Sequence, residues 1–169
     1  MMYTPADKMY LVGFMGSGKT TLARALGRRL GWRMVDLDAA IERREGRSVA
    51  RIFATSHEPH FRRVEREVLR SLLPERHMVV ATGGGTFAQP QNRADIKADG
   101  LVVWIDVPFS RIVERVPSDG RRPLAADRQA FAALFAERRA AYQEAHVRLE
   151  GDRQPVEALV ERLLDRLGW

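Results

Sequence analysis

The stretch that decides the fold is Gly13-Phe14-Met15-Gly16-Ser17-Gly18-Lys19-Thr20. Its glycines, lysine and threonine have the spacing of a Walker A phosphate-binding loop. The apolar run Met9–Val12 before it predicts a short buried strand, and Thr20–Leu30 after it carries apolar residues at helical spacing. A glycine-rich turn between a strand and a helix N-terminus points backbone N–H groups and the helix dipole at an anion. We therefore predict that the chain binds a nucleoside triphosphate.

The loop also predicts roles for individual residues. Lys19 is expected to reach the β- and γ-phosphates, and the hydroxyl of Thr20 is expected to ligate Mg²⁺. The other residues of this stretch expected to contact the nucleotide are Gly16, Ser17, Gly18 and Thr21.

Size and composition indicate one globular domain. The chain has 169 residues, of which 45% are apolar and 30% charged, so we predict a single domain over residues 1–169. No apolar run approaches the ~20 residues of a membrane helix, and the N-terminus lacks the apolar core of a secretory signal. Because the sequence has no cysteine, disulfides, thiolate metal sites and thiol catalysis are excluded. We expect a cytoplasmic monomer without membrane association.

The net charge of +6 and the isoelectric point near 10.4 raise the question of a nucleic-acid partner. The arginines, however, are spread along the chain, many of them beside Glu or Asp, and form no basic stripe interleaved with stacking aromatics. A site that binds a triphosphate and an acidic substrate also requires excess arginine. We expect no nucleic-acid partner.

Apolar runs alternate with helical patterning along the chain. Buried strands are predicted at Met9–Val12, Met34–Val35, Met78–Ala81 and Leu101–Ile105, with a weaker, edge-like strand at Val147–Leu149. Helices are predicted at Thr20–Leu30, Ala39–Arg44, Val49–Thr55, Pro59–Leu73, Gln91–Ala98, Ser110–Val116, Arg128–His146 and Pro155–Leu167. This alternation predicts an α/β fold of the P-loop type, with a doubly wound sheet of about five parallel strands and ligands at their carboxyl ends.

Residues 117–127 differ in composition from the helices on either side. They are rich in turn residues and include Arg121-Arg122. A plain surface loop has this composition. A phosphoryl-transfer enzyme also needs a mobile lid that excludes water and brings positive charge to the γ-phosphate. Because a Walker A loop is present, we favour the lid.

Two carboxylates follow the second predicted strand, in Val35-Asp36-Leu37-Asp38. Residues two apart at a strand exit project the same way, so Asp36 and Asp38 are expected to act as a pair. Such a pair can hold Mg²⁺ through its waters and accept a proton from a hydroxyl nucleophile. The alternative is that Asp38 only caps the helix predicted to begin at Ala39.

Three further patterns indicate a second, anionic ligand. Arg62 and Glu65 share a helix face, where they can form a surface pair, or Arg62 can clamp a carboxylate. The run Gly83–Gly85 costs backbone entropy, which favours a close approach of backbone to a ligand. In Arg138-Arg139, adjacent helical positions point about 100° apart, so one of the two faces solvent rather than a site.

Together these motifs resemble those of the shikimate kinase family, in its order and spacing, from Leu11 to about Leu167. The resemblance rests on Val12–Thr20, on Asp36-Leu37-Asp38 with Ile41-Glu42, on Ile52-Phe53, Glu58 and Phe61–Glu65, on Gly83–Gly85, and on Arg122-Pro123-Leu124. It implies transfer of the ATP γ-phosphoryl group to the 3-hydroxyl of shikimate, with Mg²⁺ as cofactor.

On the acceptor side, the resemblance places the substrate-binding segment at about residues 38–66. Asp38 would bind the shikimate hydroxyls and act as the base. The carboxylate would be bound by Arg62 and, counted back from Tyr142, by Arg138 rather than Arg139. The backbone of Gly83, Gly84 and Gly85 would contact shikimate.

On the donor side, the resemblance implies that Asp36 assists Mg²⁺. Arg122 would be the lid arginine that faces the phosphates, and it joins Lys19 and Asp38 in the implied catalytic set. Arg115 matches the position that stacks on adenine, and Arg153 falls in the adenine-side loop.

The chain departs from the family pattern in small ways. His57 stands where the family usually has glycine before Glu58, and Pro59-His60 is unusual. The lid continues as Ala125-Ala126 where a further leucine is common. Alternative interpretations are another small P-loop kinase, of gluconate or a nucleoside monophosphate, an ATP-dependent nucleic-acid-binding protein, and a catalytically silent relative. Intact Lys19, Asp38 and Arg138 argue against the last.

Overall fold

The computed structural model of the chain describes residues 6–116, 127–151 and 153–169, and a parallel five-stranded sheet forms its centre. The strands are β1 (Lys8–Val12), β2 (Arg33–Asp36), β3 (Met78–Ala81), β4 (Leu101–Asp106) and β5 (Val147–Glu150). The helices are α1 (Lys19–Leu30), α2 (Leu37–Glu45), α3 (Val49–Leu72), α4 (Pro90–Asp99), α5 (Phe109–Arg115), α6 (Arg128–Tyr142) and α7 (Val156–Leu167).

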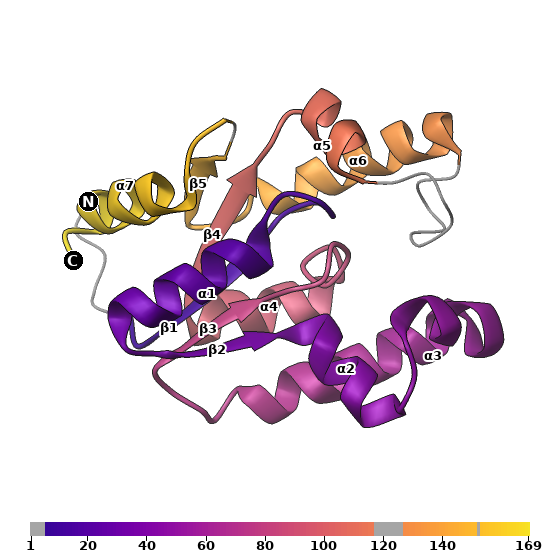
Figure 1. The fold of residues 1–169 in the computed structure, drawn as a ribbon. Helices are drawn as coiled ribbons and strands as arrows, with labels where there is room; N and C mark the ends of the chain where they lie inside the picture. Colours follow the sequence, from indigo (N-terminus) through magenta and orange to yellow (C-terminus); the bar gives the residue numbers. More distant parts are fainter. Residues whose placement is uncertain (1–5, 117–126, 152) are drawn as a thin grey trace.

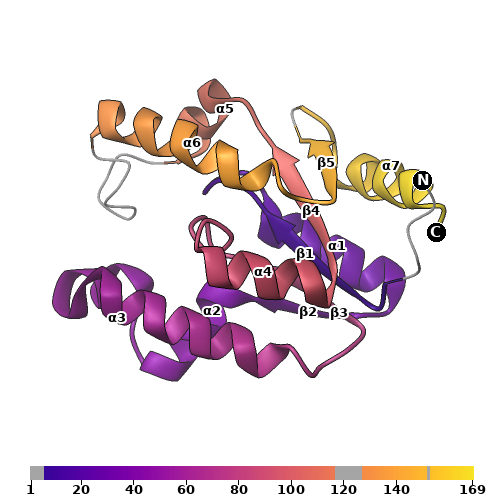
Figure 2. The same ribbon diagram turned by 180° about the vertical axis from the view of Figure 1, so that it is seen from behind.

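The sheet has the order β2-β3-β1-β4-β5, and every neighbouring pair is parallel. Helices cover both faces. α1 and α7 lie in front of the sheet in Figure 1, and α4 covers the opposite face in Figure 2, with α3 and α6 on either side of it. The order reverses at β1, which pairs with β3 on one side and β4 on the other. The predicted doubly wound fold is confirmed, and its switch point lies where β1 leads into the phosphate loop.

The core follows from the hydrophobic runs seen in the sequence. Every residue of β1, β3 and β4 is buried, as expected for strands covered on both faces. In β5 buried and exposed residues alternate, which confirms the predicted edge strand. Within the described ranges, every helix is too short or too polar to cross a lipid bilayer.

The junction of β2 and α2 differs from the sequence prediction. β2 ends at Asp36 and α2 begins at Leu37, two residues earlier than expected. The N–H of Ala39 donates to Asp36 Oδ1 (3.0 Å), so Asp36 is the cap and Asp38 lies in the first helical turn. Both the predicted capping by Asp38 and the predicted strand-exit pairing of the two carboxylates are wrong, because the helix begins inside that motif.

The end of α6 and the course of α3 also differ from the sequence prediction. α6 ends at Tyr142 rather than His146, because the chain turns there to place β5 beside β4. His146 then accepts the N–H of Val102 on its Nδ1 atom (3.0 Å). The two predicted helices at 49–55 and 59–73 form one element, α3, that is interrupted at His57 (φ 66°, ψ 170°). This backbone conformation is essentially limited to glycine.

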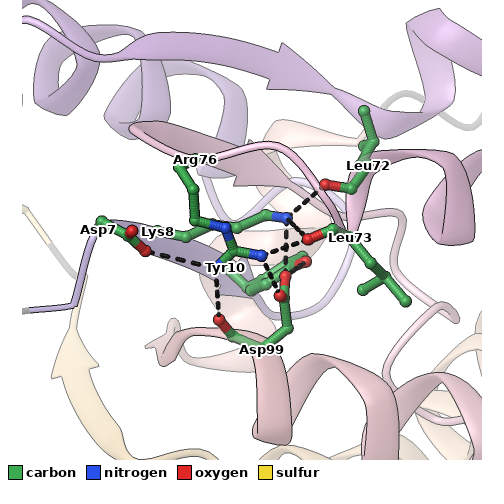
Figure 3. Close-up of polar contacts among 7 residues, drawn as sticks. All are labelled: Asp7, Lys8, Tyr10, Leu72, Leu73, Arg76 and Asp99. Atoms are coloured by element: carbon green, nitrogen blue, oxygen red, sulfur yellow. Dashed lines mark hydrogen bonds and ion pairs between the residues drawn. The ribbon is translucent and has the colours of Figure 1, made fainter.

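A buried ionic cluster closes the sheet at the end away from the phosphate loop (Figure 3). Lys8, at the start of β1, is fully buried, and its ammonium contacts the carbonyl of Leu72 (2.5 Å) and Asp99 Oδ2 (2.7 Å). Asp99 also accepts from the hydroxyl of Tyr10 (2.5 Å) and from Arg76 (2.5 Å). The cluster therefore ties β1 to the ends of α3 and α4. Sequence reasoning missed it, because its members are far apart along the chain.

The charge of Asp99 is central to this cluster. Burial raises the pKa of Asp99, but hydrogen bonds from its three donors outweigh burial and hold the pKa below its usual value. Breaking such a buried pair leaves the ammonium of Lys8 without its counter-charge. We predict that Asp99→Asn lowers the free energy of unfolding by about 3 kcal/mol, measured by urea denaturation at pH 7. Asp95 lies on α4 like Asp99 and forms a partly exposed pair with Arg66 of α3. The control Asp95→Asn should therefore cost less than about 1 kcal/mol.

The same cluster predicts a pH dependence. Because the folded-state pKa of Asp99 is depressed, its contribution is fully present above the unfolded value of about 4 and is lost as pH falls through the folded value. Below that value, the stability difference between the wild type and Asp99→Asn should shrink. A difference that stays constant from neutral to acidic pH would contradict this role.

The break in α3 predicts a stabilising substitution. His57 carries a Cβ atom in a conformation that costs ~1–3 kcal/mol for any residue but glycine. After the entropy that glycine loses on folding, we predict that His57→Gly raises the free energy of unfolding by about 1 kcal/mol. His57→Ala is the control, because it removes the imidazole and keeps the Cβ atom. Equal stability of the two variants in thermal unfolding would show that the backbone at this position is not strained.

Candidate active site

The phosphate loop joins β1 to α1, as its sequence predicts. α1 begins at Lys19, and Gly18 before it adopts a left-handed conformation (φ 91°) without a side-chain cap. The ammonium of Lys19 is held within the loop by the carbonyls of Gly13 (2.7 Å) and Phe14 (2.9 Å). The helix N-terminus and this lysine together form an electropositive site suited to phosphate oxygens.

Thr20 and Asp36, the two predicted metal residues, lie in contact. The Thr20 hydroxyl donates to Asp36 Oδ2 (2.6 Å), while the other carboxylate oxygen caps α2. Across residues 6–116, 127–151 and 153–169, no group of three or more His, Asp or Glu side chains forms a metal cage. Mg²⁺ usually takes one or two protein oxygens plus substrate phosphates, so these hard oxygen donors fit a Mg²⁺ ion that arrives with the nucleotide.

The glycine run after β3 is where the second half of the site assembles. A Cβ atom on Gly85 would lie 2.5 Å from Arg62 Nη2 and 3.0 Å from Arg138 Nη2. On Gly84 it would lie 3.3 Å from Arg138 Nη1 and equally close to the backbone N of Met15 in the phosphate loop. Two guanidinium groups, from α3 and α6, therefore converge on this bare backbone.

Asp38 reaches the same run from α2. A Cβ atom on Gly83 would lie 2.8 Å from Asp38 Oδ1. Asp38 thus shares the site with Arg62 and Arg138, whereas Asp36 faces Thr20. The two carboxylates of the Asp-Leu-Asp segment have separate surroundings, one at the phosphate loop and one at the glycine run.

Glu65 fixes the orientation of Arg62. It is fully buried, it accepts from Arg62 Nη1 (2.9 Å), and its other oxygen accepts from the hydroxyl of Thr86 (2.8 Å). The pair is therefore not the ordinary surface ion pair that the helical spacing allowed. Sequence reasoning found the three-residue spacing but missed this positioning role, because burial of Glu65 depends on the turn that follows Gly85.

Arg138 is largely buried and lies close to a second positive charge, that of Arg62. It is 9% exposed, and burial lowers the pKa of its guanidinium, with the positive charge of Arg62 adding to the effect. Arg139, the next residue, points elsewhere and binds Asp106 Oδ1 (2.7 Å). Arg138 is buried and Arg62 is partly buried, and two neighbouring like charges favour an anion between them. A carboxylate matches the fork of each guanidinium.

Room for a ligand is present beside Arg138. A cavity of about 430 Å³ lies between α6, the start of α4 and the broken part of α3, and Glu58 and Arg138 are among its lining residues. Arg62, Asp38 and the glycine run are not among its lining residues, so this cavity adjoins the site that they form with Arg138 and does not enclose it.

The other residues predicted to bind the nucleotide differ in how close the structure places them to the phosphate loop. Arg115 donates to the carbonyl of Gly16 (3.3 Å) and so lies over the phosphate loop. Arg153 is exposed, in the loop before α7. Ser17 is buried in the loop, and Thr21 is exposed in the first turn of α1. Arg122 and the predicted lid at 117–127 lie outside the described residues, except for Asp127, which caps α6.

Comparison with known proteins agrees with this geometry. Residues 15–168 match the family model described as shikimate kinase. The chain belongs to the shikimate kinase family. A shikimate kinase of Persephonella marina is 37% identical over 94% of this chain and 98% of its own length. The crystal structure of shikimate kinase from Aquifex aeolicus superposes with a TM-score of 0.87 at 36% identity, covering 95% of this chain and 96% of that one.

A second solved shikimate kinase, from Acinetobacter baumannii in complex with shikimate, has a TM-score of 0.91 at 35% identity and covers 95% of this chain and 92% of that one. The chain therefore has the P-loop NTPase fold of the shikimate kinase family. A gluconokinase from Sinorhizobium meliloti shares the fold alone, with a TM-score of 0.58 at 16% identity. The alternative of a gluconate kinase is thus a distant one.

The approach of both arginines to Gly85 predicts the effect of a side chain there. Gly85→Ala would push the two guanidinium groups aside rather than break the fold, because the contacting atoms are ends of flexible side chains. We predict that the KM for shikimate rises at least tenfold, or about 1.4 kcal/mol, while the KM for ATP changes less than twofold.

Gly31→Ala is the control for this substitution. Gly31 ends α1 with a left-handed backbone, and nothing lies within 4 Å of a Cβ atom there. It should lower stability and leave both KM values unchanged. A rise of the two KM values together in Gly85→Ala would contradict the convergence of the arginines on a carboxylate.

Proposed function

We propose that the chain transfers the γ-phosphoryl group of Mg²⁺-bound ATP to the 3-hydroxyl of shikimate, giving shikimate 3-phosphate and ADP in aromatic amino acid biosynthesis. Membership of the shikimate kinase family supports the reaction class and the acceptor. The observation that carries the residue assignments is the convergence of Asp38, Arg62 and Arg138 on the glycine run beside the phosphate loop.

On the donor side, Lys19 and the N–H groups at the start of α1 bind the phosphates and spread the charge of the transferring group. Thr20 and Asp36 would hold Mg²⁺, which would supply positive charge to the phosphates during transfer. Gly16, Ser17, Gly18 and Thr21 complete the phosphate contacts. We assign the adenine side to Arg115 and Arg153, and the closing arginine of the lid to Arg122.

On the acceptor side, the carboxylate of shikimate lies between Arg62 and Arg138. The buried carboxylate of Glu65 keeps Arg62 in place, so the ligand meets a fork that is already oriented. Asp38 orients the 3-hydroxyl and takes its proton as the oxygen attacks in line. Most of the catalytic effect then comes from positioning and charge neutralisation, since phosphoryl transfer requires little covalent chemistry from the protein.

The proposal includes a cytoplasmic monomer that acts on small molecules alone. A sequence without cysteine suits a reducing compartment. ATP and shikimate account for both halves of the site, and no feature of the described residues calls for a nucleic acid.

The function is tested by ADP release from purified protein in a coupled assay. Shikimate, quinate, gluconate and a nucleoside monophosphate are compared at equal concentration, with and without excess EDTA. We expect turnover with shikimate that is at least tenfold above every other acceptor and that disappears with EDTA. Turnover with gluconate alone would move the assignment to the gluconate kinases, and no turnover above background with shikimate would refute the proposal.

The assignment of Arg62 makes a separate prediction. Arg62→Ala removes one of two charge-assisted forks from the carboxylate, and truncating a buried charge pair of this kind costs ~2–5 kcal/mol. The KM for shikimate should therefore rise at least about thirtyfold, with the KM for ATP nearly unchanged. Because KM does not depend on the folded fraction, loss of stability at Glu65 does not confuse the measurement.

Arg66→Ala is the matched control. Arg66 lies one turn later on α3, where it pairs with Asp95 (3.1 Å) and donates to Asn92 Oδ1 (3.0 Å), both on α4. Both of its KM values should match the wild type. Equal effects of Arg62→Ala on both substrates would remove Arg62 from the carboxylate site.

A further inference from the structure

Asp106 holds two arginines at the carboxyl end of β4. It is 8% exposed, and its Oδ1 accepts from Arg139 Nη1 of α6 (2.7 Å). Its Oδ2 accepts from Nε of Arg148 in β5 (2.8 Å) and forms an ion pair with Nη2 of the same guanidinium (2.6 Å). Both guanidinium groups lie over the ring of Trp104, at 4.9 Å for Arg139 and 5.3 Å for Arg148. A nearly buried carboxylate and an aromatic face therefore fix both arginines.

Asp106 is itself a fixed point of the sheet. It is the last residue of β4, which pairs with β1 and β5, and its carbonyl accepts the N–H of Gly151 (3.0 Å). A side chain held by Asp106 is therefore held relative to the strands that carry the phosphate loop.

Arg139 transmits this constraint to the substrate site, because it directly follows Arg138 on α6. Adjacent helical residues point about 100° apart, so the direction of one determines the direction of the other. With Arg139 on Asp106, Arg138 faces Gly84 and Gly85.

Tyr142, one turn after Arg138, adds a second polar contact by donating its hydroxyl to the carbonyl of Gly84. Burial raises the pKa of Tyr142, so the hydroxyl keeps its proton.

The rest of α6 is held by apolar contacts that do not fix its rotation as tightly. Phe131 and Phe135 pack on Phe14 of the phosphate loop, with ring centroids 5.1 and 5.2 Å apart, and on Phe109 of α5. Hydrophobic contacts of this kind are non-directional. The directional contacts beside Arg138 are the hydrogen bond of Tyr142 to Gly84 and the ion pair of Arg139 with Asp106, and only the ion pair ties α6 to the end of β4.

We propose that Asp106 and Arg139 are positioning residues for the acceptor site, because their ion pair sets the rotation of α6 that presents Arg138 to the carboxylate. The inference rests on the proposed role of Arg138. Arg148 has no such role, although it shares the same carboxylate and ring, because it belongs to β5 and not to α6.

The decisive comparison is Arg139→Gln against Arg148→Gln. Both remove one arginine from Asp106 and Trp104, and only the first frees α6. We expect Arg139→Gln to raise the KM for shikimate about tenfold with little change in the KM for ATP, as misplacement of a binding group does. Arg139→Lys should recover part of the loss, because it keeps the charge and loses the fork. Arg148→Gln should keep both KM values.

Repeating the substitution in an Arg138→Gln protein distinguishes positioning of Arg138 from a general structural effect of losing Arg139. In an Arg138→Gln protein the group to be positioned is gone, so adding Arg139→Gln should change the KM for shikimate less than twofold. A purely structural role for Arg139 would give the same factor in both backgrounds, and that result would overturn the proposal. Asp106→Asn should behave like Arg139→Gln, and the two together should be no worse than either alone.

A readout without substrate keeps this inference separate from the proposed function. In ¹⁵N NMR spectra of the free protein, the amide resonances of Gly84 and Gly85 should shift in Arg139→Gln and not in Arg148→Gln. Unchanged glycine resonances in both variants would overturn the positioning role even if shikimate is the substrate. If the wild type shows no activity with shikimate but Arg139→Gln still shifts the Gly84 and Gly85 resonances, the positioning of Arg138 by Arg139 is supported and shikimate is refuted as the acceptor.

Discussion

The site depends on holding two guanidinium groups of like charge against one strip of backbone. Arg62 can approach Gly85, and Arg138 can approach both Gly84 and Gly85, because glycine has no side chain. Their repulsion is offset unequally, since Arg62 has the buried carboxylate of Glu65 and Arg138 sits where burial disfavours its charge. An anion between the two relieves both costs, so this arrangement of charges favours the binding of a carboxylate.

The two ends of the sheet carry opposite kinds of polar structure. At the amino end, Lys8 and Asp99 form a closed cluster in which buried charges are matched by partners within the protein. At the carboxyl end, Lys19 and Arg138 face the places where phosphate and carboxylate are expected. The cluster at the amino end joins helices to the sheet, whereas the residues at the carboxyl end present positive charge to ligands. This division follows from the topology, since helix N-termini and loops that can move lie at the carboxyl ends of the strands.

Local signals in the sequence predicted most of the fold and the composition of the site. The Walker A loop, the continuous apolar strands and the glycine run are read within a few residues, and the structure places them as the sequence suggested. The Asp36–Asp38 motif was misread because a strand was extended two residues into a helix, which changed the direction of one carboxylate. The pair of Asp106 and Arg139 was missed altogether, because it joins residues 33 positions apart and each is an unremarkable surface charge in the sequence.

Asp36 gives one carboxylate two separate tasks. One oxygen accepts from the hydroxyl of Thr20 in the phosphate loop, and the other caps the start of α2 by accepting the N–H of Ala39, the residue after Asp38. The side chain of Asp36 therefore joins the phosphate loop to the start of the helix that carries Asp38. Genetic loss of this residue thus damages two functions in one step, and reversion requires a residue that restores both bonds.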